Sequence, residues 1–344
     1  MSFSRKEITK AGDTLLSSKS DEEFEKALQK INIWRSNHIY PMTVMKKSII
    51  KTLDKNNIKP ILVSQRLKRL TSIIYKLDLN PKMGLGGMQD IGGYRVILKD
   101  VKDLNKLKDV IFNLTTKHKL EKTNDYVDRP KSTGYRSVHF IYKYHSSSPK
   151  YLGLRIELQI RTKLQHNWAT AVETAGLATN TSLKSNQGSD KWLNFFKVVS
   201  SLFAIKEGLK VLEEHNDISM EQLMIQCYHY IEELKVIDTL KALRVSTNHL
   251  ESKKFPGDYY LIYIDIKAQK VKITVYKNSE LPQANKEYID IEKQILNGES
   301  AVVLVSASSV RNLKKAYPSY FLDTSEFLSA LEGIRQNCIS KGFV

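Results

Sequence analysis

Cysteine is scarce in this chain, and the motifs that often accompany it are missing. Cys227 and Cys338 are the only two cysteines among 344 residues, and neither belongs to a Cys-x-x-Cys or Cys/His cluster. This usage disfavours a disulfide scaffold and a zinc site, and it suits a reducing compartment. No run approaches the ~18 apolar residues of a membrane helix, and the N-terminus lacks the apolar core of a signal peptide. We therefore expect a cytoplasmic protein with no zinc and no membrane partner.

The chain also lacks the most familiar phosphate-binding motifs. It contains no Gly-x-x-x-x-Gly-Lys-[Ser/Thr] loop and neither the His-Arg-Asp nor the Asp-Phe-Gly segment of protein kinases. Any nucleotide chemistry must therefore use another arrangement of cations and carboxylates.

Basic residues, in contrast, are in clear excess. The chain has 54 Lys and Arg against 37 Asp and Glu, a formal net charge of +17. This excess favours a polyanionic partner such as nucleic acid, or nucleotide phosphates, over a merely solvated basic surface. Between positions 42 and 77 the bases are clustered and Asp54 is the single acid. The candidates for contacts with RNA phosphates in this stretch are Lys46, Lys47, Lys51 and Arg69.

Hydrophobic periodicity predicts an α+β chain in two parts. We expect a mixed β-sheet flanked by helices over residues 1–250 and a small separate α+β module over 251–344. One predicted helix begins at Ser20. The others cover residues 43–54, 60–77, 100–118, 163–177, 192–214, 220–243, 310–316 and 325–334. The predicted strands cover 94–98, 136–144, 152–161, 259–266, 271–276 and 301–306.

One predicted strand has an unusual polar face. Apolar and polar side chains alternate from Leu154 to Arg161, so a period of two separates them onto opposite faces of a sheet. The polar face carries Arg155, Glu157, Gln159 and Arg161. A carboxylate, an amide and two guanidiniums on one face suit a site for phosphate and a metal ion.

Other polar residues extend this set. Asp90 and Glu157 are candidate ligands for a hard cation, and Tyr135 lies in a Gly-containing loop where an aromatic ring can stack on a base. The candidate partners of phosphates and bases are Arg66, Lys68, Lys76, Arg95, Lys131 and Arg161. Together they fit phosphoryl or pyrophosphoryl transfer. Plainer alternatives remain open: Asp90 as a turn residue, His139 as a packed core residue and His166 as a surface or cap residue.

Four motifs resemble the synthetase domain of the RelA/SpoT family, in the same order and with similar spacing, over roughly residues 40–180. They are Arg66-Leu-Lys68 with Lys76, Asp90-Ile-Gly-Gly-Tyr-Arg95, Pro130-Lys-Ser-Thr-Gly-Tyr-Arg-Ser-Val-His139 and Glu157-Leu-Gln-Ile-Arg-Thr162. The resemblance implies a nucleotidyltransferase-like fold that moves the β,γ-pyrophosphate of ATP to a 3′-hydroxyl with Mg²⁺. The family loop usually has Asn before Gly-Tyr, where this chain has Thr133.

The same resemblance implies individual roles. Asp90 and Glu157 would bind Mg²⁺, and Glu157 would also help to activate the 3′-hydroxyl. Arg66 and Arg95 would sandwich the adenine of ATP, while Lys68 and Lys76 would hold its phosphates. Tyr135 would stack on the acceptor base, and the rest of the acceptor side would be lined by Lys131, His139, Gln159, Arg161 and His166.

Further segments resemble the narrower CapRel type, a toxic small alarmone synthetase fused to an antitoxin module in phage defence. They are Ala11-Gly12, Trp34-Arg-Ser-Asn-His38, Gln165-His-Asn-Trp-Ala-Thr-Ala-Val-Glu173 and Ala316-Tyr-Pro-Ser-Tyr-Phe-Leu-Asp323. The type implies a C-terminal pseudo-zinc-finger whose Tyr317 and Tyr320 plug the adenine site until a phage protein, for example a capsid protein, releases them. A helix-ending turn around Pro318 is the alternative for these two tyrosines.

The acceptor that this resemblance favours is the 3′-hydroxyl of tRNA, whose modification would block translation. The first alternative is an alarmone synthetase that uses GDP, GTP or an adenine nucleotide as acceptor. A different class of alternative is an inactive RNA-binding or phage-sensing protein. We expect a monomer.

Overall fold

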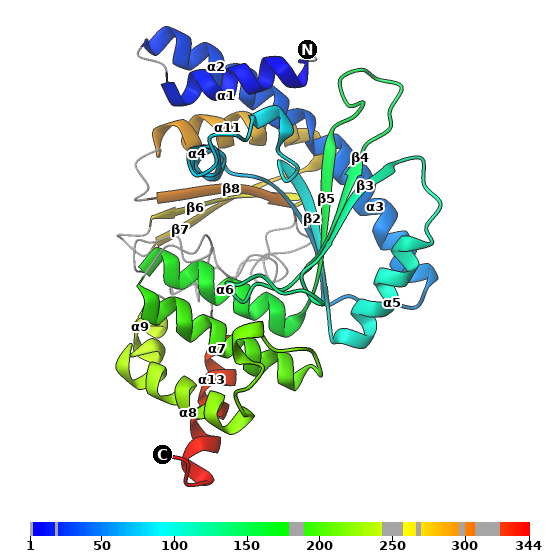
Figure 1. Ribbon diagram of the computed structural model, residues 1–344. Coiled ribbons are helices and arrows are strands. Elements are labelled where there is room, and N and C mark those ends of the chain that lie inside the picture. The colour runs from blue at the N-terminus through cyan, green and yellow to red at the C-terminus, as the bar shows by residue number, and fades with distance from the viewer. Residues whose placement is uncertain are drawn as a thin grey trace.

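A mixed β-sheet runs through the molecule, whose computed structural model describes residues 3–17, 20–178, 189–242, 257–265, 270–295, 300–306 and 324–344. In this described part the sheet has eight strands in the order β3-β4-β5-β2-β1-β8-β6-β7 (Figure 1). Strands β2 and β5 are parallel, and the other neighbours are antiparallel. The strands are β1 Leu62–Leu67, β2 Gly92–Leu98, β3 Lys119–Asp125, β4 Val138–Lys143, β5 Arg155–Thr162, β6 Tyr259–Asp265, β7 Lys270–Tyr276 and β8 Ser300–Ser306.

Helices flank the sheet on both sides. They are α1 Arg5–Ser17, α2 Asp21–Asn37, α3 Ile39–Lys55, α4 Leu70–Asp78, α5 Val101–Phe112, α6 Lys163–Ala178, α7 Asp190–Lys206, α8 Met220–Glu233, α9 Val236–Ala242, α11 Leu281–Gln294 and α13 Ser325–Ser340, with short 3-10 turns η1 Leu85–Gly87, η3 Glu213–His215 and η4 Asn278–Glu280. Among the residues described, none of these helices has the length and apolar character required to span a bilayer.

The main core lies between one face of the sheet and helices α3 and α5. Ile156, Leu158 and Ile160 of β5 are buried in it, together with apolar side chains from α3, α5, β2 and β4. Because side chains alternate along a strand, the polar residues of β5 point to the opposite face. The prediction for the face of β5 that carries Glu157 is thus confirmed, and that face is left for polar chemistry.

Two further clusters support the ends of this framework. Helices α1, α2 and α4 pack around Ile8, Ile31 and Ile73, which are fully buried. The last helix, α13, returns to pack on α6, α7 and α8, where Phe327 contacts the rings of Phe195 and Phe196.

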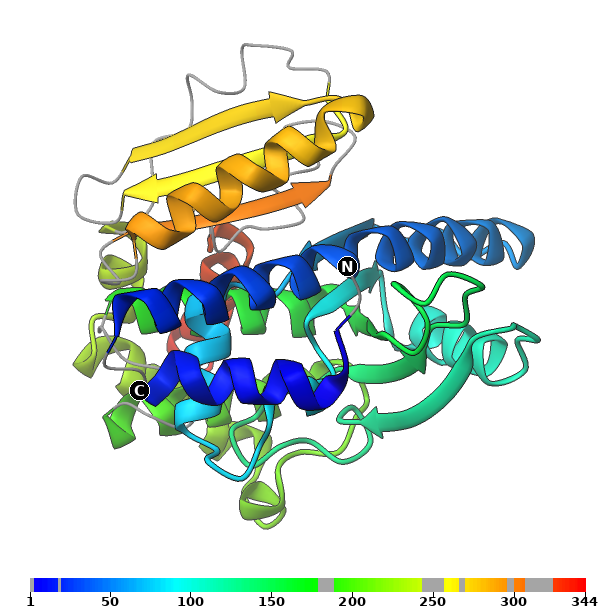
Figure 2. The ribbon, with the colours of Figure 1, turned by 90° about the horizontal axis from the view of Figure 1, so that it is seen from above.

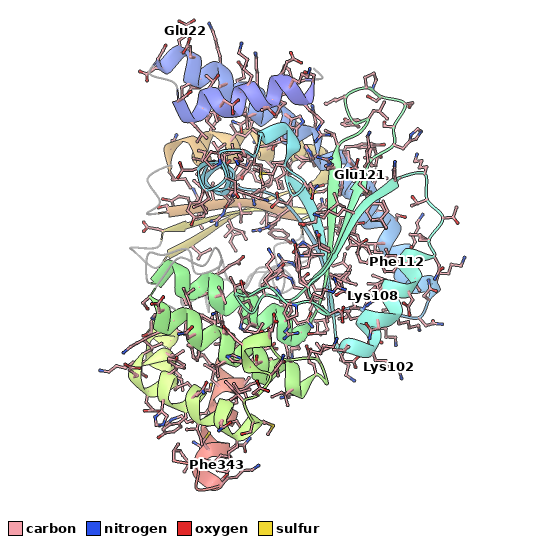
Figure 3. All side chains as sticks on the ribbon, in the orientation of Figure 1. Glu22, Lys102, Lys108, Phe112, Glu121 and Phe343 are labelled. Atoms are coloured by element: carbon pink, nitrogen blue, oxygen red, sulfur yellow. The ribbon has the colours of Figure 1, made fainter. Side chains whose placement is uncertain are left out.

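Figure 3 places Glu121 of β3 and Phe112 of α5 on the side of the molecule away from β6, β7 and β8.

The C-terminal strands continue the same sheet. Strand β8 pairs with β1 in an antiparallel register, with Gln65 opposite Ser306 and Arg66 opposite Val305. Helix α11 lies across β6, β7 and β8 (Figure 2), with Ala284 and Tyr288 buried against them. The C-terminal part of the chain therefore lies directly beside the strand that carries Arg66. The two-domain boundary at residue 250 stays a prediction.

The predicted helix over 60–77 is wrong in its first half. Leu62–Leu67 forms β1, which pairs residue by residue with β2, and the helix begins only at Leu70. The leucines of this stretch have helical spacing, but the tertiary pairing of the strand overrides that local preference. Arg66 is consequently on a strand, Lys68 and Arg69 are on a connection, and only Lys76 is on a helix.

Several predicted boundaries also shift. The helix predicted over 100–118 ends at Phe112, and β3 follows it; the helix over 192–214 ends at Lys206. The helix over 220–243 breaks at Lys235, whose φ of 46° lies in the left-handed region. Helix α11 was not predicted. The helix predicted over 310–316 lies outside the described residues.

Candidate active site

The strand register brings distant motifs onto one face of the sheet. Gly93 of β2 pairs with Arg66 of β1 on one side and with Glu157 of β5 on the other. Two residues further along β2, Arg95 pairs with Gln159 of β5. His139 of β4 is opposite Gln159 on its other side. Because directly paired residues point to the same face, the side chains of these motifs meet opposite the α3 and α5 core.

The carboxylate of Asp90, just before β2, forms ion pairs with two lysines. The Lys68 Nζ donates to Asp90 Oδ2 at 2.9 Å, and the Lys76 Nζ donates to Oδ1 at 3.0 Å. Burial alone would raise the pKa of the Asp90 carboxyl, but the two ammonium groups outweigh it and hold this pKa below its ordinary value. Burial lowers the pKa of Lys68 in spite of its partner. The cluster therefore holds two cations against one carboxylate, which favours an added anion.

Glu157 is held by His139 and Gln159. Its Oε1 lies 2.8 Å from His139 Nδ1, and its Oε2 accepts a hydrogen bond from Gln159 Nε2 at 2.7 Å. Burial alone would raise the pKa of the Glu157 carboxyl, but the contact with His139 outweighs burial and lowers this pKa. Burial alone would lower the pKa of His139, but Tyr135 and Glu157 outweigh it and raise this pKa. The two side chains thus stabilise each other as an ion pair. His139 is more than a packed core residue, because its ring makes polar contacts at both nitrogens.

The other nitrogen of His139 connects the pair to the loop tyrosine. His139 Nε2 lies 2.9 Å from the Tyr135 hydroxyl, which also accepts a hydrogen bond from Arg161. Arg161 donates to Gln159 Oε1 at 3.0 Å, and Arg95 Nε donates to the same oxygen at 3.3 Å. Burial and the nearby cations Arg161 and Arg66 lower the pKa of Arg95 to about 10. Several cations so close together create a strong preference for an anionic ligand.

The cavity at the centre of this face is small. It has a volume of about 50 Å³ and is lined by Ser64, Gln65, Arg66, Lys68, Asp90, Gly93, Tyr94, Arg95, Glu157 and Gln159. Drug-sized ligands occupy pockets of roughly 300–1,000 Å³. A nucleoside triphosphate therefore requires this site to open.

Asp90 and Glu157 fit a magnesium site that is completed by substrate phosphates. Both line the same cavity, and the charge of Asp90 is near enough to oppose ionisation of Glu157. The residues described contain no cage of three or more His, Cys, Asp or Glu side chains that could hold a metal without help. Mg²⁺ commonly takes one or two carboxylates and otherwise binds water and phosphate.

The remaining predicted residues are distributed around this centre. The Lys131 Nζ lies 4.7 Å from the ring centre of Tyr126 and 5.5 Å from that of Tyr135. His166 is buried near the start of α6. Trp168 is a core residue, and its indole N–H donates to Phe196 O at 2.8 Å. Tyr317 and Tyr320 lie outside the described residues.

The basic stretch is not gathered with the carboxylates. Lys46, Lys47 and Lys51 lie on α3, the helix that covers the opposite face of the sheet, and Arg69 precedes α4. Lys47 and Lys51 are exposed. Burial and the neighbouring Lys47 lower the pKa of Lys46 to about 8. A ligand that occupies the carboxylate site can therefore contact these lysines only if it is large enough to reach around the sheet.

Gly134 fixes the loop that presents Tyr135. Its φ is +90°, and an added Cβ would lie 2.9 Å from Ser200 Cβ and 3.1 Å from Trp168 Cζ2. We expect Gly134→Ala to lower the free energy of unfolding by about 1–3 kcal/mol, through backbone strain and this contact. Gly208→Ala is the matched control, since its φ of +67° carries the strain but no atom lies within 4 Å. Urea unfolding of both variants tests this, and equal losses would show that the contact contributes nothing.

Two residues next to the site were missed by sequence reasoning. The guanidinium of Arg35 on α2 donates to Glu292 Oε2 on α11 at 2.8 Å and to the Lys68 carbonyl at 2.8 Å. Arg35 follows Leu28 and Ile31 at helical spacing, on the apolar side of α2. A charged residue on such a face was a signal of a buried partner, but the sequence does not indicate which acid pairs with it.

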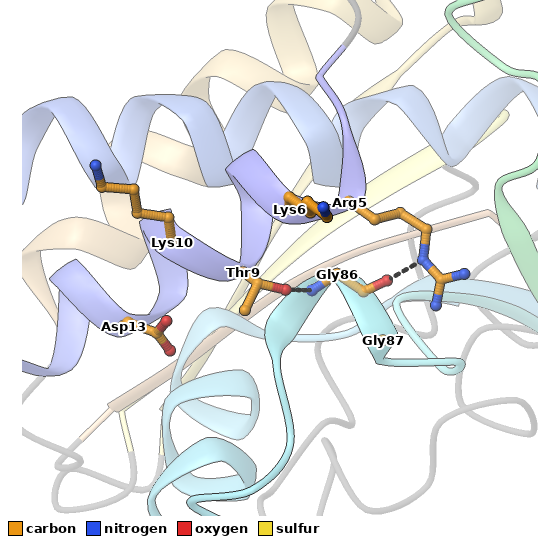
Figure 4. A pocket seen from close by; sticks show the side chains of 7 residues that line it. All are labelled: Arg5, Lys6, Thr9, Lys10, Asp13, Gly86 and Gly87. Carbon is orange, nitrogen blue, oxygen red and sulfur yellow. Dashed lines mark hydrogen bonds between the residues drawn. The ribbon is translucent and has the colours of Figure 1, made fainter.

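A more open hollow lies away from this centre. It has a volume of about 430 Å³ and is lined by Arg5, Lys6, Thr9, Lys10, Asp13, Gly86 and Gly87 (Figure 4). Arg5 Nε donates to Gly86 O at 2.7 Å, and the Gly86 N–H donates to Thr9 Oγ1 at 3.1 Å. These bonds attach α1 to the turn between α4 and β2. None of the predicted catalytic residues lines this hollow.

Comparison with known proteins matches the same part of the chain. Residues 65–186 match the model of the region found in RelA / SpoT proteins. The chain is 34% identical over 116 residues to the probable GTP diphosphokinase RSH3, chloroplastic, of Arabidopsis thaliana. This alignment covers 34% of this chain and 15% of that protein. The chain is 32% identical over 113 residues to the GTP pyrophosphokinase YjbM of Bacillus subtilis. This alignment covers 31% of this chain and 52% of that protein.

The alignments thus span about half, or less, of the length of these curated relatives. Among solved structures, the small alarmone synthetase 1 of Bacillus subtilis aligns with a TM-score of 0.44 and 21% identity, over 55% of this chain and 94% of that one. Every residue that the strand register gathers around Asp90 and Glu157 lies inside the matched segment. Residues 65–186 of this chain are therefore similar to the region found in RelA / SpoT proteins.

Proposed function

We propose that this chain is an ATP-dependent pyrophosphotransferase, which moves the β,γ-pyrophosphate of ATP to a 3′-hydroxyl. The observation that carries the proposal is the meeting of two carboxylates, Asp90 and Glu157, with a surplus of lysines and arginines around one cavity. Transfer of a phosphoryl group needs mainly positioned cations and a group that receives the hydroxyl proton. The RelA/SpoT region and the names of its relatives, GTP pyrophosphokinases, support the same class of reaction.

In the proposed reaction the 3′-oxygen of the acceptor forms a bond to the β-phosphorus of ATP. The bond between that phosphorus and the oxygen bridging to the α-phosphorus breaks, and AMP leaves. Glu157 receives the hydroxyl proton, and the pairing with His139 orients its carboxylate. Lys68 and Lys76 release Asp90 and bind the ATP phosphates. Mg²⁺, held by Asp90 and Glu157, would neutralise charge on the transferred group.

We favour the 3′ end of tRNA as the acceptor. A stripe of exposed residues on α3 supports this choice: Tyr40, Lys47 and Lys51 follow at helical spacing on one face. Tyr40 is 53% exposed, and one face of its ring stacks on Tyr151 at 4.8 Å between centroids. An exposed aromatic ring beside lysines suits a nucleic-acid strand, whose bases stack and whose phosphates pair with the cations. A nucleotide acceptor would have no use for these residues.

The second candidate is a guanine nucleotide as acceptor, which would make the chain an alarmone synthetase. The names of the matched relatives favour it. Tyr135 with Lys131 and Arg161 around its ring could hold a single base and its phosphates without any contact on α3. An adenine nucleotide would fit the same arrangement.

Substitution of the α3 lysines separates these acceptors. We expect Lys47→Gln/Lys51→Gln to weaken tRNA binding and to flatten its salt dependence by about 2 in the slope of log K against log salt, because each phosphate contact contributes about 0.9. Lys102→Gln/Lys106→Gln on α5 removes two lysines elsewhere and is the charge-matched control. Fluorescence anisotropy with labelled tRNA at several salt concentrations measures both slopes. Equal slopes for the two variants would count against tRNA contact on α3.

The regulatory part of the proposal concerns the C-terminal residues. We propose that Tyr317 and Tyr320 restrain the ATP side, and that a phage protein releases them and so starts a translation-blocking defence. The pairing of β8 with the strand that carries Arg66 supports a close relation between the C-terminal part and this side of the site. Tyr317→Ala/Tyr320→Ala should raise the transfer rate of the isolated protein, and an unchanged rate would contradict the restraint.

A further inference from the structure

A carboxylate of helix α11, Glu292, lies against the connection between β1 and α4. The Glu292 side chain is 3% exposed, and its two oxygens face the Arg35 guanidinium, with Oε2 at 2.8 Å from Nη1 and Oε1 at 3.4 Å from Nη2. Glu292 Oε1 also accepts hydrogen bonds from the Tyr288 hydroxyl at 2.8 Å and from the Leu70 N–H at 2.5 Å. Three segments that are far apart in the sequence are thus connected at one buried carboxylate.

The contact with Leu70 acts on a helix terminus. Leu70 is the first residue of α4, and the residue before it is Arg69, whose side chain has no hydrogen-bond acceptor. The first N–H groups of a helix need an acceptor and favour negative charge. Glu292 supplies both from a position 222 residues away. Helix α4 in turn carries Lys76, which reaches Asp90.

The contact through Arg35 acts on the other lysine. Arg35 Nη2 donates to the Lys68 carbonyl at 2.8 Å, while Nη1 donates to Asn32 Oδ1 at 2.8 Å and to Glu292. The main chain of Lys68 is therefore fixed on one side by Arg35, and its side chain reaches Asp90 on the other. Without Glu292, the guanidinium would keep its donors but lose the charge that holds it in this orientation.

We propose that Glu292 is a positioning residue for the ATP side of the site. It acts through the Leu70 N–H and through Arg35, and it fixes the backbone from which Lys68 and Lys76 converge on Asp90. The C-terminal part of the chain thereby completes the phosphate-binding segment of residues 65–186. This inference rests on the proposed function, in which the two lysines bind the phosphates of ATP.

The test uses the full-length chain and three variants. Glu292→Gln removes the charge. Arg35→Met/Glu292→Met removes the buried pair as a unit, so that no charge is left unpaired. Glu287→Gln is the matched control on the same helix, because the Glu287 carboxylate bonds to the Tyr276 hydroxyl instead. Two quantities are measured: the Kd for the α,β-methylene analogue of ATP with Mg²⁺, and the hydrogen–deuterium exchange of the α4 amides, with the melting temperature as a check on folding.

We expect Glu292→Gln and the double variant to raise this Kd about tenfold or more and to speed exchange over residues 70–78. Misplacement of a binding group by about 1 Å is sufficient for such an effect. Glu287→Gln should leave both quantities unchanged. A loss of affinity in a double variant that melts near the wild-type temperature is a result that a purely structural role would not produce.

Other outcomes overturn the inference in distinct ways. An unchanged Kd in the folded double variant would reduce Glu292 to a structural residue. A lower Kd would show that docked α11 restrains the site instead of completing it. If neither the wild-type chain nor its Tyr317→Ala/Tyr320→Ala variant bound the analogue, the proposed function would fail. The exchange measurement would still decide the positioning, because unchanged exchange over α4 would refute it.

Discussion

Replacement of Glu157 by glutamine is expected to lower the rate of pyrophosphoryl transfer by about 10²–10⁴-fold, the usual contribution of a positioned general base. Glutamine has nearly the same shape, but it cannot receive the hydroxyl proton and carries no charge for a metal ion or for His139. The pKa of His139 should also fall, because the Glu157 carboxylate is one of the groups that raise it. Labelled ATP measures the first effect, and NMR titration of His139 measures the second.

The control for this substitution is Glu232→Gln on α8, whose exposed carboxylate pairs with Arg335 at 2.8 Å. It should retain the wild-type rate. Binding of tRNA should persist in Glu157→Gln, since the α3 lysines are unchanged. A Glu157→Gln variant with the wild-type transfer rate would contradict the assignment of the base. Loss of tRNA binding together with transfer would indicate that Glu157 contributes to binding and not to chemistry alone.

Arg35→Met is expected to lower the free energy of unfolding by about 3–5 kcal/mol, because it leaves the buried Glu292 carboxylate without its counter-charge. Arg35 and Glu292 side chains are 2% and 3% exposed, so solvent cannot replace the missing partner. Burial disfavours the charge on Arg35, but Glu292 and Tyr288 outweigh it and raise the pKa of the guanidinium further above its ordinary value. The Arg35 guanidinium therefore keeps its charge beside Glu292.

Arg335→Met provides the matched comparison for this loss. Its guanidinium lies 2.8 Å from Glu232, the same separation as in the buried pair, but the two side chains are 32% and 47% exposed. Exposed ion pairs contribute about 0–1 kcal/mol, so this variant should unfold close to the wild type. Arg35→Met/Glu292→Met should recover much of the loss of the single variant, because neither charge remains. Urea unfolding compares all three, and equal losses for Arg35→Met and Arg335→Met would refute the account of the buried pair.

The chemistry of the site was easier to predict than its architecture. The alternation along β5 identified the face that carries Glu157, and the apolar residues of the same strand are buried as that pattern requires. Asp90 precedes the predicted strand 94–98 and Arg95 lies in it, and the resemblance to the RelA/SpoT motifs implied that both belong to one site. Such signals are local: each depends on residues within one strand and its adjoining turn.

The errors arose where structure depends on distant partners. Leu67, Leu70 and Leu77 follow at helical spacing, but Leu67 belongs to the segment Leu62–Leu67, which its pairing with β2 makes a strand. Arg35 and Glu292 are separated by 257 positions, so neither residue predicts the other from its surroundings in the sequence. The continuation of the sheet from β1 to β8 is of the same kind, because two short segments nearly 240 residues apart meet only after the chain has folded.

Transfer of label from γ-labelled ATP tests the central claim most directly. The full-length chain and its Tyr317→Ala/Tyr320→Ala variant would be incubated with Mg²⁺ and either bulk tRNA or GDP with GTP, and Glu157→Gln in each background would be the control. We predict that label appears on an acceptor and that Glu157→Gln prevents it. Label on tRNA would support the favoured acceptor, and label on guanine nucleotide the alternative. Bound ATP without transfer to any acceptor, in either protein, would contradict the proposed pyrophosphotransferase.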